Sequence, residues 1–151
     1  MVILCAIFFA LSIVTGPATS FVFLYAQDVL HLAGYVSALM VVAAGASGGI
    51  GLLVGRWLGD RIGRRPTCSM AMVAIALTPA FAYSGAKSAL IAGYILGALS
   101  GGLLSPSLGA LLTELFPTSV RASVTGWSVT AGVVGAVCGL VVFGAVAVTP
   151  R

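Results

Sequence analysis

The chain has 151 residues, of which 60% are hydrophobic and 7% are charged, and its formal net charge is +4. Soluble domains contain about 25% charged residues, so this composition excludes an ordinary water-soluble globular protein. Charge-free runs of about 18 or more residues are typical of membrane spans. We therefore expect an all-α polytopic membrane protein. The basic residues stand at the ends of the apolar runs, which argues against a nucleic-acid-binding surface.

Five apolar runs are long enough to cross a bilayer, for which about 17 to 25 residues are needed. In chain order they cover residues 2–26, 32–54, 67–83, 89–112 and 122–148. These runs predict about five transmembrane helices in one domain, residues 1–151. The first run has no basic leader and is too long for a signal peptide, so we interpret it as a retained span. From its position at the very start, we expect the chain to be a fragment or a truncated open reading frame.

The first run carries Thr15 and Thr19 at helical spacing, with Gly16-Pro17 between them. The fourth run contains Ser105-Pro106-Ser107, a second proline with hydroxyl neighbours. Such paired breaks point to a substrate path in transporters, although hydroxyls also bond to their own or neighbouring helices. Trp127 fits either an interfacial anchor or a cavity wall. The candidate cavity residues are Thr15, Thr19, Tyr25, Ser105, Ser107 and Trp127.

Small residues recur at intervals of four, which allows another helix to approach closely. This spacing predicts helix contacts at Gly45/Gly49, Gly51/Gly55, Gly55/Gly59, Gly93/Gly97/Gly101 and Gly135/Gly139.

The most polar stretch, Gly55–Arg65, reads Gly-Arg-Trp-Leu-Gly-Asp-Arg-Ile-Gly-Arg-Arg. An arginine at the centre of a bilayer costs roughly 2.5 to 3.5 kcal/mol, so we expect a short loop at the membrane surface. Pro66 suits the first turn of the next helix. The loops on this side hold Arg56, Arg61, Arg64, Arg65 and Arg121, against Lys87 and Arg151 on the other. The positive-inside rule then predicts that this side is cytoplasmic.

Patterns for other functions are weak. Gly45-Ala46-Ser47-Gly48 resembles the nucleophile motif of rhomboid proteases, but the sole histidine, His31, stands near a surface and is a poor base for Ser47. Asp28 and His31 could pair if the helix continued past them; the alternative is a solvated loop. The cysteines lack metal-ligand or disulfide spacing. We expect no enzymatic activity, no cofactor and no metal.

Two segments resemble the major facilitator superfamily. Leu58–Arg65 is similar to the signature loop Gly-x-Leu-Ala-Asp-Arg-x-Gly-Arg-Lys, with the first signature glycine replaced by Arg56. Glu114–Arg121 is similar to the Glu-x-Phe-Pro-x-x-x-Arg segment of sugar and metabolite porters. The resemblance implies a secondary transporter in the plasma (inner) membrane that works by alternating access between two six-helix bundles. The Phe-Pro-Thr segment looks more like the C-terminal half, helices seven to eleven.

The resemblance also implies a network of gating residues: Asp60, Arg61, Gly63, Arg64, Arg65, Glu114 and Arg121. Opposite charges on adjacent loops can bias a two-state equilibrium by about 1 kcal/mol. The alternative is that the arginines only set topology and bind anionic lipid.

The partners implied are the lipid bilayer, a small solute with or without a proton, and the missing transporter half, but no nucleic acid. Because no span has an ionisable residue near its middle, symporter and facilitator both stay open. The alternative function is a non-transporting membrane module that packs with another membrane protein.

Overall fold

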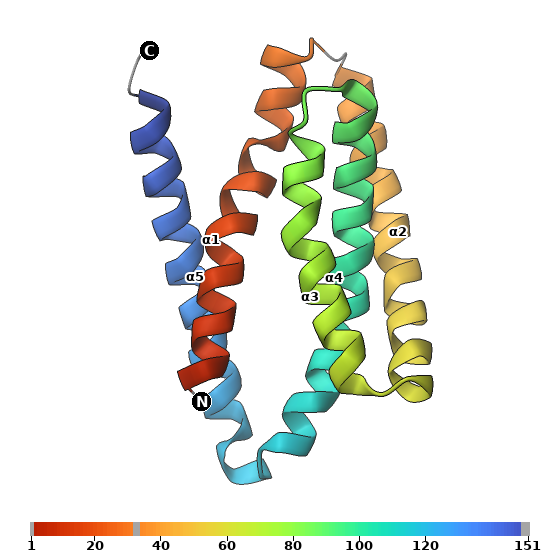
Figure 1. The fold of residues 1–151 in the computed structure, drawn as a ribbon, viewed down its shortest axis with the longest axis vertical. Helices are drawn as coiled ribbons and strands as arrows, with labels where there is room; N and C mark the ends of the chain where they lie inside the picture. The colour runs from red at the N-terminus through yellow and green to blue at the C-terminus, as the bar shows by residue number, and fades with distance from the viewer. Residues whose placement is uncertain (1, 32–33, 149–151) are drawn as a thin grey trace. The chain divides into compact units, whose positions relative to one another are not determined.

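In the computed structural model, the described residues are 2–31 and 34–148, with the backbone alone for 113 and 146–148. This part of the chain is helical apart from short turns and contains no strand, as predicted (Figure 1). The elements are α1 (Val2–Leu24), the π-helical segment η1 (Tyr25–Val29), α2 (Gly34–Arg61), α3 (Arg64–Ala82), α4 (Lys87–Leu115) and α5 (Thr118–Val148).

Four of these helical stretches are long and apolar enough to cross a membrane: Val2–Val29, Gly34–Arg61, Lys87–Leu112 and Thr118–Ala145. This confirms the prediction of an all-α membrane protein. Helix α3 is not among the four, because Arg64 and Arg65 occupy the first two of its 19 residues. That α3 forms a fifth span therefore stays a prediction.

The prediction of a loop at Gly55–Arg65 is wrong for most of this stretch. Helix α2 continues to Arg61 and α3 begins at Arg64, so two residues separate them. Arginine is a good helix former, and its long side chain reaches the membrane surface while the backbone stays helical. The break falls at Gly63, whose φ of 106° suits glycine. The charged side chains are consequently held at fixed helical positions.

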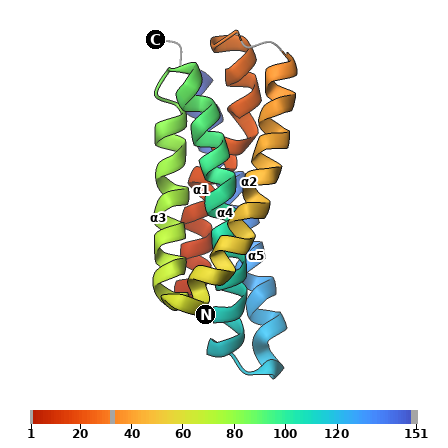
Figure 2. The same cartoon turned by 90° about the vertical axis from the view of Figure 1, so that its right-hand side faces the viewer.

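The chain divides into two compact units, one formed by Met1–Phe21 with Phe116–Arg151 and the other by Val22–Leu115. In the second unit, α4 lies between α2 and α3 in both views (Figures 1 and 2). Helices α2 and α4 run parallel, and three glycines of α2 meet α4 one turn apart: Gly51 at Leu99, Gly55 at Leu103 and Gly59 at Ser107. The predicted close contacts of these glycines are confirmed.

Of the other predicted glycines, Gly93 packs against Ala82 and Gly97 against Thr78, as expected, but three do not have such a contact. A Cβ atom added at Gly45, Gly49 or Gly101 would meet nothing within 4 Å, so these glycines contact no helix among the described residues. On α4 it is Gly102 that packs closely against the Gly48 backbone. Spacing identifies a small-residue stripe, but it does not show which stripe has a partner.

Two buried serines join α2 and α4 in opposite directions. The Ser47 hydroxyl of α2 shares its hydrogen between the Ile95 carbonyl of α4, at 3.1 Å, and the Ala44 carbonyl of its own helix, at 2.9 Å. The Ser107 hydroxyl of α4 donates to the Gly55 carbonyl of α2 at 3.2 Å. Both inter-helix bonds become possible because the intervening glycines let the backbones approach. The Ser47 hydroxyl is thus engaged in helix packing.

In the first unit, α1 and α5 run parallel and in close contact. Gly135 packs against the backbone of Phe9, and Gly139 packs against the backbone of Ile13. Further along, the rings of Phe21 and Phe143 lie 4.8 Å apart. The predicted contact at Gly135/Gly139 is confirmed.

The segment η1 lies near the N-terminal end of the second unit and packs into its apolar cluster. Its Ala26 belongs to a buried apolar cluster, and the ring of Tyr25 lies 5.0 Å from that of Tyr83. The helix ends before His31, which has a left-handed φ of 49°. The Asp28/His31 pairing that a continued helix would allow is therefore lost, and both residues are exposed.

Candidate functional site

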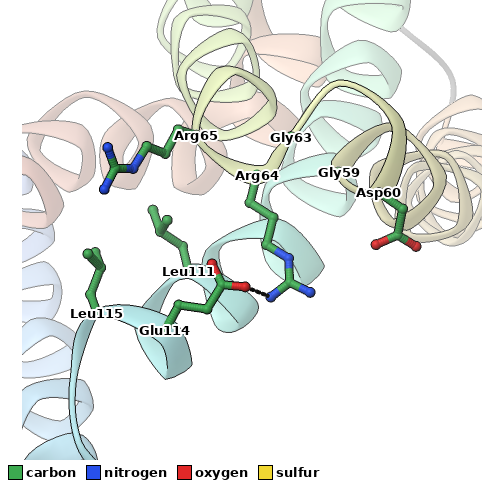
Figure 3. A pocket seen from close by; sticks show the side chains of 8 residues that line it. All are labelled: Gly59, Asp60, Gly63, Arg64, Arg65, Leu111, Glu114 and Leu115. Atoms are coloured by element: carbon green, nitrogen blue, oxygen red, sulfur yellow. Dashed lines mark hydrogen bonds and ion pairs between the residues drawn. The ribbon is translucent and has the colours of Figure 1, made fainter.

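The charged end of the second unit is centred on an ion pair between α3 and α4. Arg64, the first residue of α3, donates through Nη1 to Oε1 of Glu114, in the last turn of α4, at 2.5 Å (Figure 3). Their side chains are 36% and 55% exposed, so water reaches the pair. A bond between two ionised groups is stronger than a neutral one, although exposure reduces its value. The pair ties the start of α3 to the end of α4.

A hollow of about 470 Å³ surrounds this pair. Its lining residues are those drawn in Figure 3: Gly59, Asp60, Gly63, Arg64, Arg65, Leu111, Glu114 and Leu115. A second hollow, of about 300 Å³, shares Gly59, Asp60 and Arg64 and extends toward Arg56 and Ser107. The Asp60 carboxylate lies on the side of Arg64 away from Glu114. Among the described residues, no ion pair joins Asp60 to an arginine.

Local backbone features place these charges. The turn at Gly63 lets the chain reverse between α2 and α3, and the Thr67 hydroxyl donates to the Gly63 carbonyl at 2.8 Å. Gly59 leaves room for Ser107, since a Cβ there would lie 3.1 Å from the Ser107 Oγ. The end of α2 can therefore lie close to α4, beside Glu114.

The arginines of the cluster divide into different environments. The Arg61 guanidinium lies over the ring of Trp57, with its carbon 4.7 Å from the ring centroid. Arg65 is exposed and directed away from the Arg64–Glu114 pair (Figure 3). Of the predicted gating arginines in this unit, only Arg64 bonds to Glu114. The contact between Trp57 and Arg61 was not predicted, although a Trp four residues before an Arg is a recognisable helical pair.

Arg121 belongs to the other unit. It is partly buried, and its Nη2 donates to the carbonyl of Phe116 at 3.4 Å. No group of three or more His, Cys, Asp or Glu side chains able to hold a metal ion occurs in the described part of the chain.

Comparison with known proteins decides the family. Residues 2–150 match the family model described as Major Facilitator Superfamily. The chain belongs to the major facilitator superfamily. It is therefore an integral membrane protein of a transporter family and not of an enzyme family. Neither the curated proteins nor the solved structures gave a match.

Two of the six candidate cavity residues of this major facilitator chain, Thr15 and Thr19, bond within their own helix. In the first unit, the Thr15 hydroxyl donates to the Leu11 carbonyl at 3.0 Å and the Thr19 hydroxyl to the Thr15 carbonyl at 2.9 Å. Such bonds leave the hydroxyl oxygen able to accept one from a solute. Trp127, on α5, is 60% exposed.

In the second unit, the candidates are placed differently. Tyr25 is partly buried against Tyr83, and Ser105 is exposed. Ser107 is 3% exposed and bonded to α2, which favours a packing role over a cavity role. Sequence could not separate Ser105 from Ser107, because the difference depends on which side of α4 meets α2.

Proposed function

We propose that this chain is part of a secondary transporter that moves a small solute by alternating access, with the cluster around Arg64 and Glu114 as its cytoplasmic gate. Family membership supports transport, and the ion pair at one end of the second unit supports the position of the gate. The proposed gating residues are Asp60, Arg61, Gly63, Arg64, Arg65, Glu114 and Arg121. The observation that carries the gate is the Arg64–Glu114 bond.

The physical role of the pair is to present neighbouring charges at fixed positions. Arg64 is neutralised by Glu114, whereas the Asp60 carboxylate is exposed on the rim of the same hollow. A group on the other transporter half can bond to Asp60 in one conformation and leave it in the other. A difference of about 1 kcal/mol between the two states changes their ratio about five-fold.

The solute of this transporter is proposed to be small and polar. The candidate cavity positions carry hydroxyl and aromatic groups, namely Thr15, Thr19, Tyr25, Ser105 and Trp127, which can donate and accept hydrogen bonds and stack on a ring. We place the chain in the C-terminal half, helices seven to eleven, of a plasma-membrane transporter. If the transporter is a proton symporter, the proton-binding side chain lies outside the spans of this chain.

Accessibility of a single cysteine tests the gate in the transporter that contains this chain. Ser105→Cys is introduced after the native cysteines are replaced by serine, and a membrane-impermeant maleimide is applied from each side. Glu114→Gln should change the ratio of inside to outside labelling about five-fold, because it removes the charge that holds Arg64. Transport is followed with a panel of radiolabelled monosaccharides and small organic acids.

Asp28→Asn is the matched control, because it neutralises an exposed carboxylate of the same unit outside the gate. Its labelling ratio should equal that of the parent protein. If Glu114→Gln, Arg64→Gln and Asp60→Asn all label and transport like the parent, the cluster is not a gate.

A further inference from the structure

Helix α2 has one continuous surface that α4 does not cover, because Gly45, Gly49, Leu53 and Trp57 follow one another four residues apart, and the two parts of this surface differ in character. One carries Gly45 and Gly49, where an added Cβ would meet nothing within 4 Å. The other carries Ile50, Leu53 and Trp57, spaced three and four residues apart and each more than half exposed. Small residues suit close contact with a second helix, whereas bulky apolar side chains suit flexible acyl chains. The part of this surface with the bulky side chains therefore favours lipid.

Arg61 lies at the end of this bulky apolar surface and carries a positive charge. Arg61 follows Trp57 by one helical turn, and its guanidinium carbon lies 4.7 Å from the centroid of the Trp57 ring. The indole attracts the cation through the ring face, which leaves the N–H groups at the edge of the guanidinium able to donate. Arg64, by contrast, already donates to Glu114. Arg61 is thus the arginine of this cluster that is placed to take an anion beside an apolar surface.

We propose that Trp57 and Arg61 form a binding site for an anionic phospholipid. The phosphate accepts hydrogen bonds from Arg61, the indole of Trp57 lies at the level where headgroup meets hydrocarbon, and an acyl chain follows Leu53 and Ile50 along α2. Tryptophan is enriched at this level of the bilayer. Residues 55–65 hold four arginines and one aspartate, a net charge of +3, and Glu114, which neutralises Arg64, lowers the net charge of the cluster to +2. This positive charge favours an anionic lipid over a zwitterionic one.

Contact quenching of Trp57 by brominated lipids tests the site in the full chain. The chain contains two tryptophans, so Trp127→Phe makes Trp57 the sole reporter. The protein is reconstituted in phosphatidylcholine vesicles that contain brominated phosphatidylglycerol or, at the same mole fraction, brominated phosphatidylcholine. We expect phosphatidylglycerol to compete about five-fold better for the position beside Trp57. Arg61→Gln should reduce this preference to about one-fold.

Arg56→Gln is the matched control. It removes the same charge from the same helix, but Arg56 lines a hollow with Asp60 and Arg64 and is not stacked on Trp57. The Arg56→Gln protein should retain most of the preference for phosphatidylglycerol at Trp57. The Glu114→Gln protein should retain it too. The complementary Trp57→Phe protein reports from Trp127, where Arg61→Gln should change nothing.

Three results would overturn the proposal. These are equal quenching by the two lipids at Trp57, an equal loss of preference in Arg56→Gln and Arg61→Gln, or a similar loss at Trp127. The second result would mean that the arginines attract anionic lipid only through their total charge. Because lipid preference is measured without solute or transport, failure here leaves the proposed gate untouched.

Discussion

Arg64 and Glu114 are bonded at 2.5 Å although 50 residues of chain separate them. The bond joins the first turn of α3 to the last turn of α4, at the end of the unit where the arginines gather. Because both side chains are more than a third exposed, the pair should contribute more to the choice between conformations than to the stability of the fold.

The first prediction concerns the stability of that pair. Arg64→Gln, Glu114→Gln and the double variant should give a coupling free energy of about 0.2 to 1 kcal/mol in a double-mutant cycle, as exposed ion pairs do. Unfolding of the chain in detergent, followed by circular dichroism, measures it. A coupling well above this range would mean that the pair supports the fold itself.

The second prediction separates the glycines of α2 by their surroundings. A Cβ at Gly55 would lie 2.5 Å from the Leu103 carbonyl oxygen, so Gly55→Ala must push α2 and α4 apart. We expect a loss of about 1 to 3 kcal/mol in the free energy of unfolding. Gly49→Ala meets open space and should gain about 0.5 to 1 kcal/mol from helix propensity. Equal effects of the two substitutions would contradict the parallel contact of α2 and α4.

The third prediction concerns the two serines between α2 and α4. Ser107→Ala should lower the free energy of unfolding by about 0.6 kcal/mol, the average for hydrogen bonds between membrane helices. Ser47→Ala should cost less than Ser107→Ala, because the Ser47 hydrogen is shared with the Ala44 carbonyl of its own helix. Ser128→Ala is the control, since the buried Ser128 hydroxyl donates within its own helix, to the Val124 carbonyl. Its loss should be smaller, and a larger loss for Ser128 would argue against the inter-helix bonds.

The fourth prediction tests the first unit by a designed disulfide. A Cβ at Gly132 would lie 3.2 Å from the Ser12 Oγ, within reach of a disulfide. In a background without the native cysteines, Ser12→Cys with Gly132→Cys should lose maleimide labelling after mild oxidation. Ser12→Cys with Gly144→Cys should keep it, because Gly144 has no neighbour within 4 Å of its Cβ position. Persistent labelling of the first pair would refute the parallel arrangement of α1 and α5.

The fifth prediction decides whether α3 crosses the membrane. Its 19 residues extend about 28 Å, close to the hydrocarbon thickness of about 30 Å. Arg65→Cys and Ser84→Cys each place a single cysteine at one end of α3. Both positions are exposed in the parent chain. We expect a membrane-impermeant maleimide to label them from opposite sides. Labelling from one side would remove α3 from the spans and reverse the orientation of all that follows.

Much of the fold could be predicted because hydrophobicity and glycine spacing are properties of the sequence. Long apolar runs require helices in lipid, where every backbone polar group must be bonded internally. Gly51, Gly55 and Gly59 lie four residues apart on one side of the helix, and this spacing correctly predicted a close contact with another helix. The same rule failed at Gly45 and Gly49, because spacing does not say whether another helix is present at that face.

The site was harder to predict than the fold. Four arginines fall within residues 55–65, and their positions in the sequence do not show which of them bonds to Glu114. The choice of Arg64 depends on the backbone turn at Gly63, which hydrophobic patterns do not reveal. Extending α2 to Arg61 placed that arginine one turn after Trp57, a contact that a flexible loop would not define.

The π-helical turn at Tyr25–Val29 affects which changes of chain length the helix before it tolerates. There the Leu30 amide bonds to the Tyr25 carbonyl, five residues back, so the segment accommodates one residue more than regular α-helix. Because the wide turn takes up the extra residue, Leu30 keeps the position that a regular helix one residue shorter would give it. Deleting one residue of this turn should therefore restore regular α-helix and leave Leu30 in the apolar cluster, whereas deleting one residue within α1 should rotate Leu30 by about 100° out of that cluster.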